Sequence, residues 1–455
     1  MKRKSIICMA VMVFIILNTS YSQWTAQTAP PLPWYYSILS FHAVDENIVW
    51  AVADTIKPSE SYIGSPYVLR TTDGGDSWNV RSIPQTDGTY LMDVAAVDAN
   101  TAWVTMNGLS ADSVGGIFKT TDGGETWTAQ LDQVKSVYIH FFDMDNGVQV
   151  NRHRIHITTN SGNTWELIPP ENIPSFGDEE STIYYCANNA VAVSGDRIWM
   201  GTSYGRILRS TDKGLHWDIT AIAGTFNLAI LSVSFRDTLH GIATACYNGK
   251  TFQPVRTKMA RTSDGGETWE MISNPPSTTA GESITYVPGT EHTYVVNSHY
   301  HLAGTAISMD DGVSWTTVDD KGCYGLAFVS PTKGWSSLIT TPENTANYIL
   351  RWSGNSLPVE EMSSSGTASS FALEECYPNP VVSSATISFH LPSAGLTRLT
   401  VHDVLGRCVK VLAEEFRHAG AHKVTFNESH LPSGVYVYRL AWNGQVMTRR
   451  MTLLK

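Results

Sequence analysis

Short runs of apolar and β-branched residues follow turn residues at regular intervals along most of the chain. Examples lie at 45–53 (DENIVWAVA), 98–106 (DANTAWVTM) and 195–201 (GDRIWMG). Runs of this length bounded by Asp, Asn and Gly are typical of β-strands. Long helical runs of Ala, Glu, Lys and Leu are missing. The pattern therefore predicts an all-β, turn-rich protein.

An eight-residue motif, [ST]-x-[DN]-x-G-x-x-W, organises these strands into a repeat. It occurs six times, at 71–78, 120–127, 158–165, 210–217, 262–269 and 308–315. Repeats of roughly 40–50 residues that are rich in strand formers predict the blades of a β-propeller.

A seventh strand copy without a motif lies at 330–338, which leaves seven units and six motifs. The mismatch has an explanation at the start of the chain, where WTAQ at 24–27 repeats the WTAQ that follows the second motif at 127–130. We therefore expect the N-terminal segment to join residues 322–354 as the outermost strand of a seventh blade. Closing the ring in this way removes an open sheet edge.

The motif has the composition of a tight hairpin between the third and fourth strands of a blade. Its Asp or Asn can accept backbone N–H groups across the turn, and its Gly supplies a positive φ. Its Trp is expected to fill the gap between neighbouring blades, where burial of the indole side chain stabilises the propeller. These structural positions are Asp73, Trp78, Asp122, Trp127, Asn160, Trp165, Asp212, Trp217, Asp264, Trp269, Asp310 and Trp315.

The motif resembles the Asp-box (BNR) repeat over about residues 24–355. Families with this repeat include sialidases, sortilin-type receptors, two-propeller xyloglucanases and the photosystem II assembly and stability factor. The combination of a "W-x-V" strand with "T-x-DGG-x-TW" is most similar to the last of these. The resemblance implies a seven-bladed β-propeller over residues 23–355.

The two ends of the chain predict export. Residues 1–22 have the basic start and the short apolar core of a secretory signal peptide. Residues 356–370 have the Ser/Gly-rich composition of a linker. Short alternating strands in 371–455 predict a small β-sandwich with an Ig-like arrangement.

The last 85 residues also carry YPNP at 377–380, V-x-D-x-x-G-R at 401–407 and L-x-x-G-x-Y-x-Y-R-L at 431–440. These motifs resemble the type A C-terminal sorting domain of the type IX secretion system. The resemblance implies a partnership with the type IX secretion machinery and a protein that is secreted or held on the outer-membrane surface of a Gram-negative bacterium.

Charge and composition limit the classes of partner that the protein can bind. The chain of 455 residues has a formal net charge of −11. Residues 23–370 contain 19 Lys and Arg against 36 Asp and Glu, so this acidic body is a poor partner for nucleic acid. No apolar run after the signal is long enough to span a membrane. Five scattered Cys remain after the signal, an odd count without a CxxC pair.

Two clusters stand out as candidate ligand contacts. Arg152, Arg154 and His156 would share one face of a strand, and His299, Tyr300 and His301 occupy an expected loop between second and third strands. The alternative is that both are ordinary exposed residues. His-x-His lacks a third ligand, so no metal and no cofactor are predicted.

The sequence favours a non-enzymatic binding scaffold for an extracellular protein or glycan. The alternative is a secreted, sialidase-like glycoside hydrolase that uses carboxylates on the loop face of the propeller. Its expected Arg-Ile-Pro segment is matched only by the interrupted Arg81-Ser82-Ile83-Pro84. We assign no catalytic residue.

Overall fold

The computed structural model of the chain describes most of the residues after the signal segment. The described residues are 23–33, 36–55, 66–83, 89–108, 115–132, 136–151, 154–175, 190–225, 228–248, 254–276, 281–298, 304–320, 323–338, 340, 346, 348–352, 371–376, 378–381, 384–391, 395–403, 407–417, 420–427, 431–442 and 445–454. The predicted signal peptide (1–22) and linker (356–370) lie outside them.

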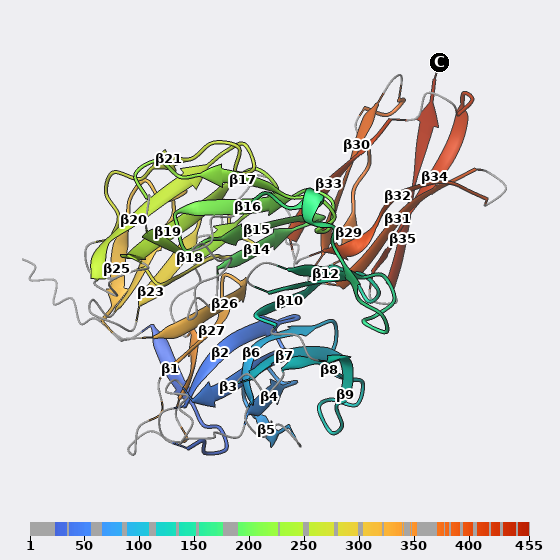
Figure 1. Ribbon diagram of the computed structural model, residues 1–455. Helices are drawn as coiled ribbons and strands as arrows, with labels where there is room; N and C mark the ends of the chain where they lie inside the picture. The colour runs from blue at the N-terminus through green and yellow to red at the C-terminus, as the bar shows by residue number, and fades with distance from the viewer. Residues whose placement is uncertain are drawn as a thin grey trace, which may run out of the picture.

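Seven four-stranded antiparallel sheets, which we call blades 1–7, make up residues 24–352 of the described chain (Figure 1). Blade 1 contains β2 (Tyr36–Ala43), β3 (Val49–Thr55), β4 (Tyr67–Thr71) and β5 (Asn79–Ser82). Blade 2 contains β6 (Thr89–Ala96), β7 (Ala102–Gly108), β8 (Gly116–Thr120) and β9 (Thr128–Asp132). Blade 3 contains β10 (Tyr138–Phe141), β11 (Gly147–Val150), β12 (Ile155–Thr158) and β13 (Glu166–Leu167), and the 3-10 helix η1 (Pro170–Asn172) follows it.

The remaining blades repeat this order. Blade 4 contains β14 (Val191–Ser194), β15 (Arg197–Gly201), β16 (Arg206–Ser210) and β17 (Asp218–Ala221). Blade 5 contains β18 (Leu228–Phe235), β19 (Gly241–Asn248), β20 (Pro254–Thr262) and β21 (Glu270–Met271). Blade 6 contains β22 (Ser283–Tyr286), β23 (Tyr294–Ser298), β24 (Gly304–Ser308) and β25 (Thr316–Asp319). Blade 7 contains β26 (Tyr324–Ser330), β27 (Lys333–Ser337), β28 (Ile349–Trp352) and β1 (Trp24–Gln27).

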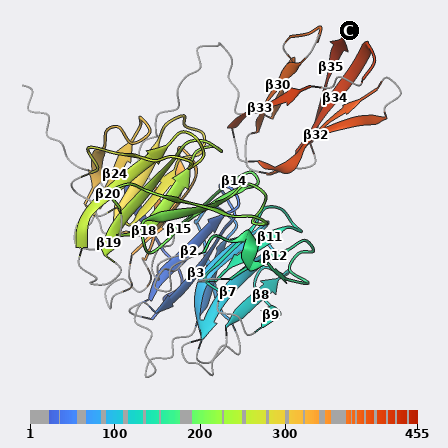
Figure 2. The same cartoon turned by 45° about the horizontal axis from the view of Figure 1, so that its top comes forward.

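The first strands of neighbouring blades pack against one another, and three of them, β2, β14 and β18, are labelled in Figure 2. Strand β2 contacts both β6 and β26, β6 contacts β10, and β22 contacts β18 and β26. Each blade then runs outward as a meander of antiparallel neighbours. This arrangement confirms the all-β propeller expected from the repeat.

The two ends of the propeller meet in blade 7, as the repeated WTAQ predicts. Strand β1 pairs antiparallel with β28, with Trp24 opposite Trp352. The Trp24 side chain is buried, its ring lies edge-on to Trp352 at 5.2 Å, and its Nε1 donates to Thr305 Oγ1 of blade 6 at 3.1 Å. The N-terminal strand therefore closes blade 7 and also joins it to blade 6.

Every Asp-box forms the hairpin between the third and fourth strands of its blade. In the first box, Thr71 Oγ1 donates to Asp73 Oδ1 at 2.8 Å, and the same carboxylate oxygen accepts the Ser77 N–H at 2.9 Å. The two residues after the Asp have positive φ, with Gly74 at 72° and Gly75 at 92°. Non-glycine residues occupy the first of these positions in three boxes, namely Ser161, Lys213 and Asp311.

The turn between the first and second strands holds the box of the same blade. The first positive-φ residue of each box donates its N–H to a carbonyl of this turn, as Gly74 does to Asn47 at 3.0 Å. The same bond joins Gly123 to Asn100, Ser161 to Asp145, Lys213 to Asp196, Gly265 to Leu239 and Asp311 to His292. Both repeated sequence elements thus meet at one end of the propeller.

The box Trp packs at the junction with the preceding blade. A Cβ on Gly124 would contact both Trp127 of its own box and Trp50 of blade 1, and the corresponding Gly162 lies between Trp165 and Trp103. The second-strand Trp50 and Trp103 are fully buried. Four of the six box Trp residues are paired with a second buried indole in this way, whereas Val148 and Ile242 take the place of that indole in the fourth and sixth boxes.

Cations of the third strand connect neighbouring blades on the same end. Arg70 Nη1 donates to Ala99 O at 2.6 Å, and Lys119 Nζ donates to Ser161 O at 3.0 Å. Arg351 of blade 7 pairs with Asp76 of the first box at 2.7 Å. Each of these contacts joins the box end of one blade to the next blade.

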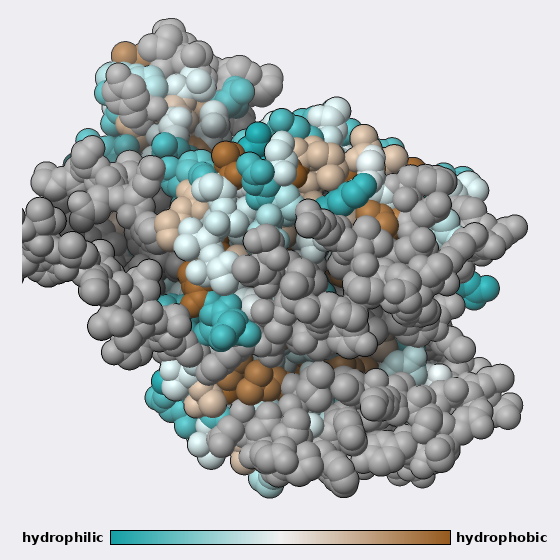
Figure 3. Space-filling view, turned by 90° about the vertical axis from the view of Figure 1, so that its left-hand side faces the viewer, coloured by the Kyte–Doolittle hydropathy of each residue, from teal (hydrophilic) through white to brown (hydrophobic). Residues whose placement is uncertain are grey.

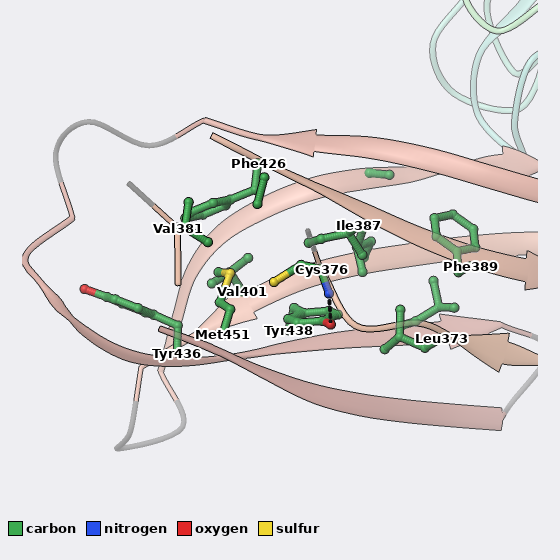
Figure 4. Packing of buried hydrophobic residues seen from close by; sticks show 14 of the residues in the cluster. Leu373, Cys376, Val381, Ile387, Phe389, Val401, Phe426, Tyr436, Tyr438 and Met451 are labelled. Carbon is green, nitrogen blue, oxygen red and sulfur yellow. Dashed lines mark hydrogen bonds between the residues drawn. The ribbon is translucent and has the colours of Figure 1, made fainter. Parts of the chain in front are cut away.

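Residues 371–454 form a two-sheet β-sandwich with one core (Figure 4). One sheet has the order β29-β30-β33 and the other β32-β31-β34-β35. The core contains Phe389, Phe426 and Tyr438, whose hydroxyl accepts the Cys376 N–H at 2.9 Å. The strands are β29 (Ala372–Leu373), β30 (Ala385–Leu391), β31 (Gly395–His402), β32 (Cys408–Arg417), β33 (Gly420–Phe426), β34 (Gly434–Trp442) and β35 (Gln445–Leu453).

Within the described residues, no helix is long and apolar enough to cross a membrane.

Candidate functional site

The end of the propeller opposite the Asp-boxes is the candidate binding face. In a four-stranded meander, this end carries the starts of the first strands and the connections between second and third strands. The starts of β2, β6, β10 and β26 therefore lie together around the ring axis. Part of this face lies outside the described residues, and the described part consists mainly of the strand starts.

Tyrosines occupy these strand starts in consecutive blades. Tyr324 in blade 7, Tyr90 in blade 2 and Tyr138 in blade 3 are partly exposed. Between blades 7 and 2, Tyr36 of blade 1 is buried, and its ring lies edge-on to that of Tyr67 at 5.6 Å. We call Tyr324, Tyr36, Tyr90, Tyr138 and Tyr204 the tyrosine arc; Tyr204 is partly exposed in the turn between β15 and β16 of blade 4.

A buried carboxyl group lies below the arc. Asp93 in β6 accepts the Ser40 hydroxyl of blade 1 at 2.6 Å and the Ile139 N–H of blade 3 at 3.0 Å, and it also accepts the Val94 N–H at 2.9 Å. Burial raises the pKa of Asp93 to about 7, although these hydrogen bonds act in the opposite direction. One side chain thus links the first strands of three blades.

The charge state of Tyr138 follows from the burial of its own hydroxyl. Burial, together with the nearby Asp93 carboxyl, raises the pKa of the Tyr138 hydroxyl well above its usual value. Tyr138 is therefore a neutral phenol at any physiological pH. Neutral tyrosines offer an apolar ring together with a hydroxyl that can donate or accept a hydrogen bond.

The predicted basic and imidazole clusters are described only in part. Arg154 is exposed just before β12. His156 is 9% exposed, and its Nδ1 lies 2.9 Å from Gln149 Oε1 on the neighbouring strand. Burial, with the neighbouring Arg154 charge, lowers the pKa of His156. Arg152, His299, Tyr300 and His301 lie outside the described residues.

The Asp-box carboxylates accept hydrogen bonds from residues of their own turns, as Asp73 does from Thr71 and Ser77. A side-chain hydrogen bond from Ser77 lowers the pKa of Asp73 to about 2, and Thr126 does the same for Asp122. For Asp264, burial opposes the shift, but hydrogen bonds from Thr268 again bring the pKa to about 2. Within the described residues, no group of three or more His, Cys, Asp or Glu could hold a metal ion.

The box carboxylates predict an acid-sensitive fold. Their pKa is lower in the folded state than the ordinary 3.8, so their stabilisation is present above about pH 4 and is lost as the pH falls toward 2. In the third box, Asn160 makes the same contacts without a charge, because Oδ1 accepts the Thr164 N–H at 2.9 Å and Nδ2 donates to Thr164 Oγ1 at 2.8 Å.

Asp122→Asn is therefore expected to fold normally at pH 7 and to reduce the loss of stability between pH 4 and pH 2. Urea denaturation at a series of pH values measures both effects. The Asp122→Ala variant is the control that removes the contacts as well as the charge, and it should lose stability at every pH. A slope for Asp122→Asn below pH 4 equal to that of the natural chain would contradict the charge assignment.

Comparison with known proteins separates the two parts of the chain. Residues 375–453 match the family model described as the secretion system C-terminal sorting domain. No curated protein matches the chain in sequence. The matched domain assigns the protein to export by the type IX secretion system, to the cell surface or the medium.

The propeller has similar solved structures with very different activities. YCF48 from Cyanidioschyzon merolae, a photosystem II assembly factor, has a TM-score of 0.51 and 16% identity over 72% of this chain and 98% of that chain. The GH74 xyloglucanase from Xanthomonas campestris has a TM-score of 0.50 and 11% identity over 81% of this chain and 59% of that chain.

A fungal alcohol oxidase of the AA5 family, in complex with copper, has a TM-score of 0.50 and 11% identity over 94% of this chain and 100% of that chain. At these identities the similarity shows the fold alone. The resemblance to Asp-box propellers followed by a sorting domain is confirmed, and the fold is compatible with both enzymes and non-enzymes.

The tyrosine arc was not among the features predicted from the sequence. The signal was present, because a Tyr stands at or near the start of several first strands. It was difficult to recognise because first strands carry no motif of their own, unlike the third-to-fourth hairpins.

Proposed function

We propose that this exported protein is a non-enzymatic binding scaffold that holds an extracellular protein or glycan against the tyrosine arc. The observation that carries the proposal is the run of tyrosines through five consecutive blades, four of them partly exposed. Tyrosine supplies a large amphipathic contact at low cost in conformational entropy, so it is enriched at binding surfaces.

The Asp93 carboxyl beside the arc does not favour hydrolysis. A glycosidase needs two carboxyl groups that reach the sugar, about 5–9.5 Å apart. Both oxygens of Asp93 are instead occupied by protein donors, and its side chain is buried. Asp93 therefore supports the shape of the face rather than a reaction on it.

One side of the molecule has a surface of mixed polarity. In the side view of Figure 3, apolar residues form small separate groups among polar ones over the described surface. Mixed surfaces of this kind are usual for contacts between proteins that form and dissociate.

The double variant Tyr90→Ala/Tyr324→Ala tests the proposal. The ligand is first found by screening glycans and surface proteins with the mature chain. We expect the double variant to bind this ligand about tenfold more weakly, or weaker still, because central aromatic contacts often contribute above about 1 kcal/mol each. Leu215→Ala is the control, because Leu215 is 43% exposed in the fourth Asp-box, at the other end of the propeller.

Equal affinity for both variants would contradict the role of the arc. Turnover of a glycan by the natural chain, abolished by a carboxylate substitution on the same face, would instead favour the glycoside hydrolase. Thermal denaturation of each variant shows whether the blades remain folded.

A further inference from the structure

Four exposed apolar side chains lie along the outer face of one sheet of the sorting domain. Leu396, Val411, Val435 and Val446 are 59%, 41%, 44% and 46% exposed, respectively. They come from all four strands of the β32-β31-β34-β35 sheet. Isolated exposed apolar residues are normal, but several on one sheet face mark an interaction surface.

The strand register places these residues on the same side. Arg398 of β31 pairs with Ala441 of β34, which pairs with Val446 of β35. The next row along the sheet is Thr400, Arg439 and Thr448. In β31 and β34, residues of the alternate parity are buried in the sandwich core, as Leu399 and Leu440 are. The outer rows therefore face away from the core, although Thr400 is only 4% exposed.

This surface is also basic. Arg439 and Arg450 are exposed among its valines and threonines, and Val437 pairs with Arg450. Arg398 lies on the same face, and Glu414 is opposite it in register on β32. Residues 371–455 carry nine Lys and Arg against six Asp and Glu, the reverse of the acidic propeller. We call this surface the basic sheet face.

We propose that the basic sheet face is the surface by which the sorting domain docks on an acidic patch of a protein of the secretion machinery. Charge complementarity selects an acidic partner, because arginines on a surface give specificity and faster association with the opposite charge. The β-branched side chains between the arginines require an apolar counterpart of fixed shape, which a protein surface provides. The proposal depends on the export assignment and not on the proposed ligand of the propeller.

Export of the full chain tests the proposal. Arg439→Glu/Arg450→Glu reverses two charges on the basic sheet face, and the exported fraction is expected to fall by about tenfold or more. Arg439→Lys/Arg450→Lys keeps the charges and should retain most of the export. A chain without residues 371–455 defines the level of no export.

A matched control comes from the other sheet. Lys423 is exposed on β33, so Lys423→Glu makes the same change in net charge as Arg450→Glu on the opposite face of the sandwich. The proposal requires that Arg450→Glu lowers the exported fraction while Lys423→Glu leaves it unchanged. Thermal denaturation of the purified chains must give equal midpoints for the two variants.

Three outcomes would overturn the proposal. Normal export of the double variant would show that this face is not the docking surface. Equal loss of export in Lys423→Glu would show a response to net charge rather than to a face. Binding of the purified chain to lipopolysaccharide vesicles that is abolished by the double variant, with normal export, would show a lipid surface as the partner.

Discussion

Trp24→Ala is expected to lower the free energy of unfolding of the propeller by about 3–5 kcal/mol, the usual cost of truncating a large buried aromatic residue. Trp24 is 2% exposed and packs against Phe328 and Trp352 within blade 7. Its indole N–H also donates to Thr305 of blade 6. The substitution therefore leaves a cavity at the point where the two ends of the ring meet.

The neighbouring position on the same strand provides the control. Thr25 is exposed and pairs with Arg351 through its backbone, so Thr25→Ala should change stability by no more than about 0.5 kcal/mol. Urea denaturation followed by circular dichroism compares the two variants. Equal midpoints would show that the N-terminal strand does not stabilise the closed ring.

The blades could be predicted from the repeat because the residues of each box contact one another within a short stretch of sequence. The Asp, the Gly and the Trp of each box form a hairpin from contacts within eight residues, as Thr71, Asp73 and Ser77 show. The closure by residues 24–27 was also predictable, because a missing fourth strand left the repeat incomplete. Local hydrogen bonds and a regular period therefore determine most of the propeller.

The candidate site was less predictable because it depends on contacts between blades. Arg154 and His156 have the spacing of one strand face, but the strand begins only at Ile155, and His156 is buried beside Gln149. Asp93 and Ser40 are 53 residues apart in sequence, and neither belongs to a motif. To predict this contact, one must know which first strands are neighbours and where their register shifts.

Asp93 gives the second large effect, a loss of stability as the pH rises. Burial raises its pKa from 3.8 to about 7, so the folded state holds a proton that the unfolded state releases above about pH 4. For a shift of about three units, linkage predicts that ionisation costs about 4 kcal/mol of stability between pH 4 and pH 8. This change of stability with pH has the opposite sign to the change caused by the Asp-box carboxylates.

Asp93→Asn is therefore expected to flatten the dependence of stability on pH between 4 and 8, whatever its own cost at a single pH. That cost arises because the Ser40 hydroxyl and the Ile139 N–H donate to different oxygens of Asp93. The amide of Asn has only one oxygen, so it cannot accept both hydrogen bonds in the same way. Asp122→Asn is the matched control, because it should keep the slope between pH 4 and 8 and reduce only the slope below pH 4. Unfolding free energies of both variants, measured across pH 2–8, distinguish the buried Asp93 from the Asp-box carboxylates. If the stability of Asp93→Asn fell between pH 4 and 8 as steeply as that of the natural chain, the pH dependence would belong to another group.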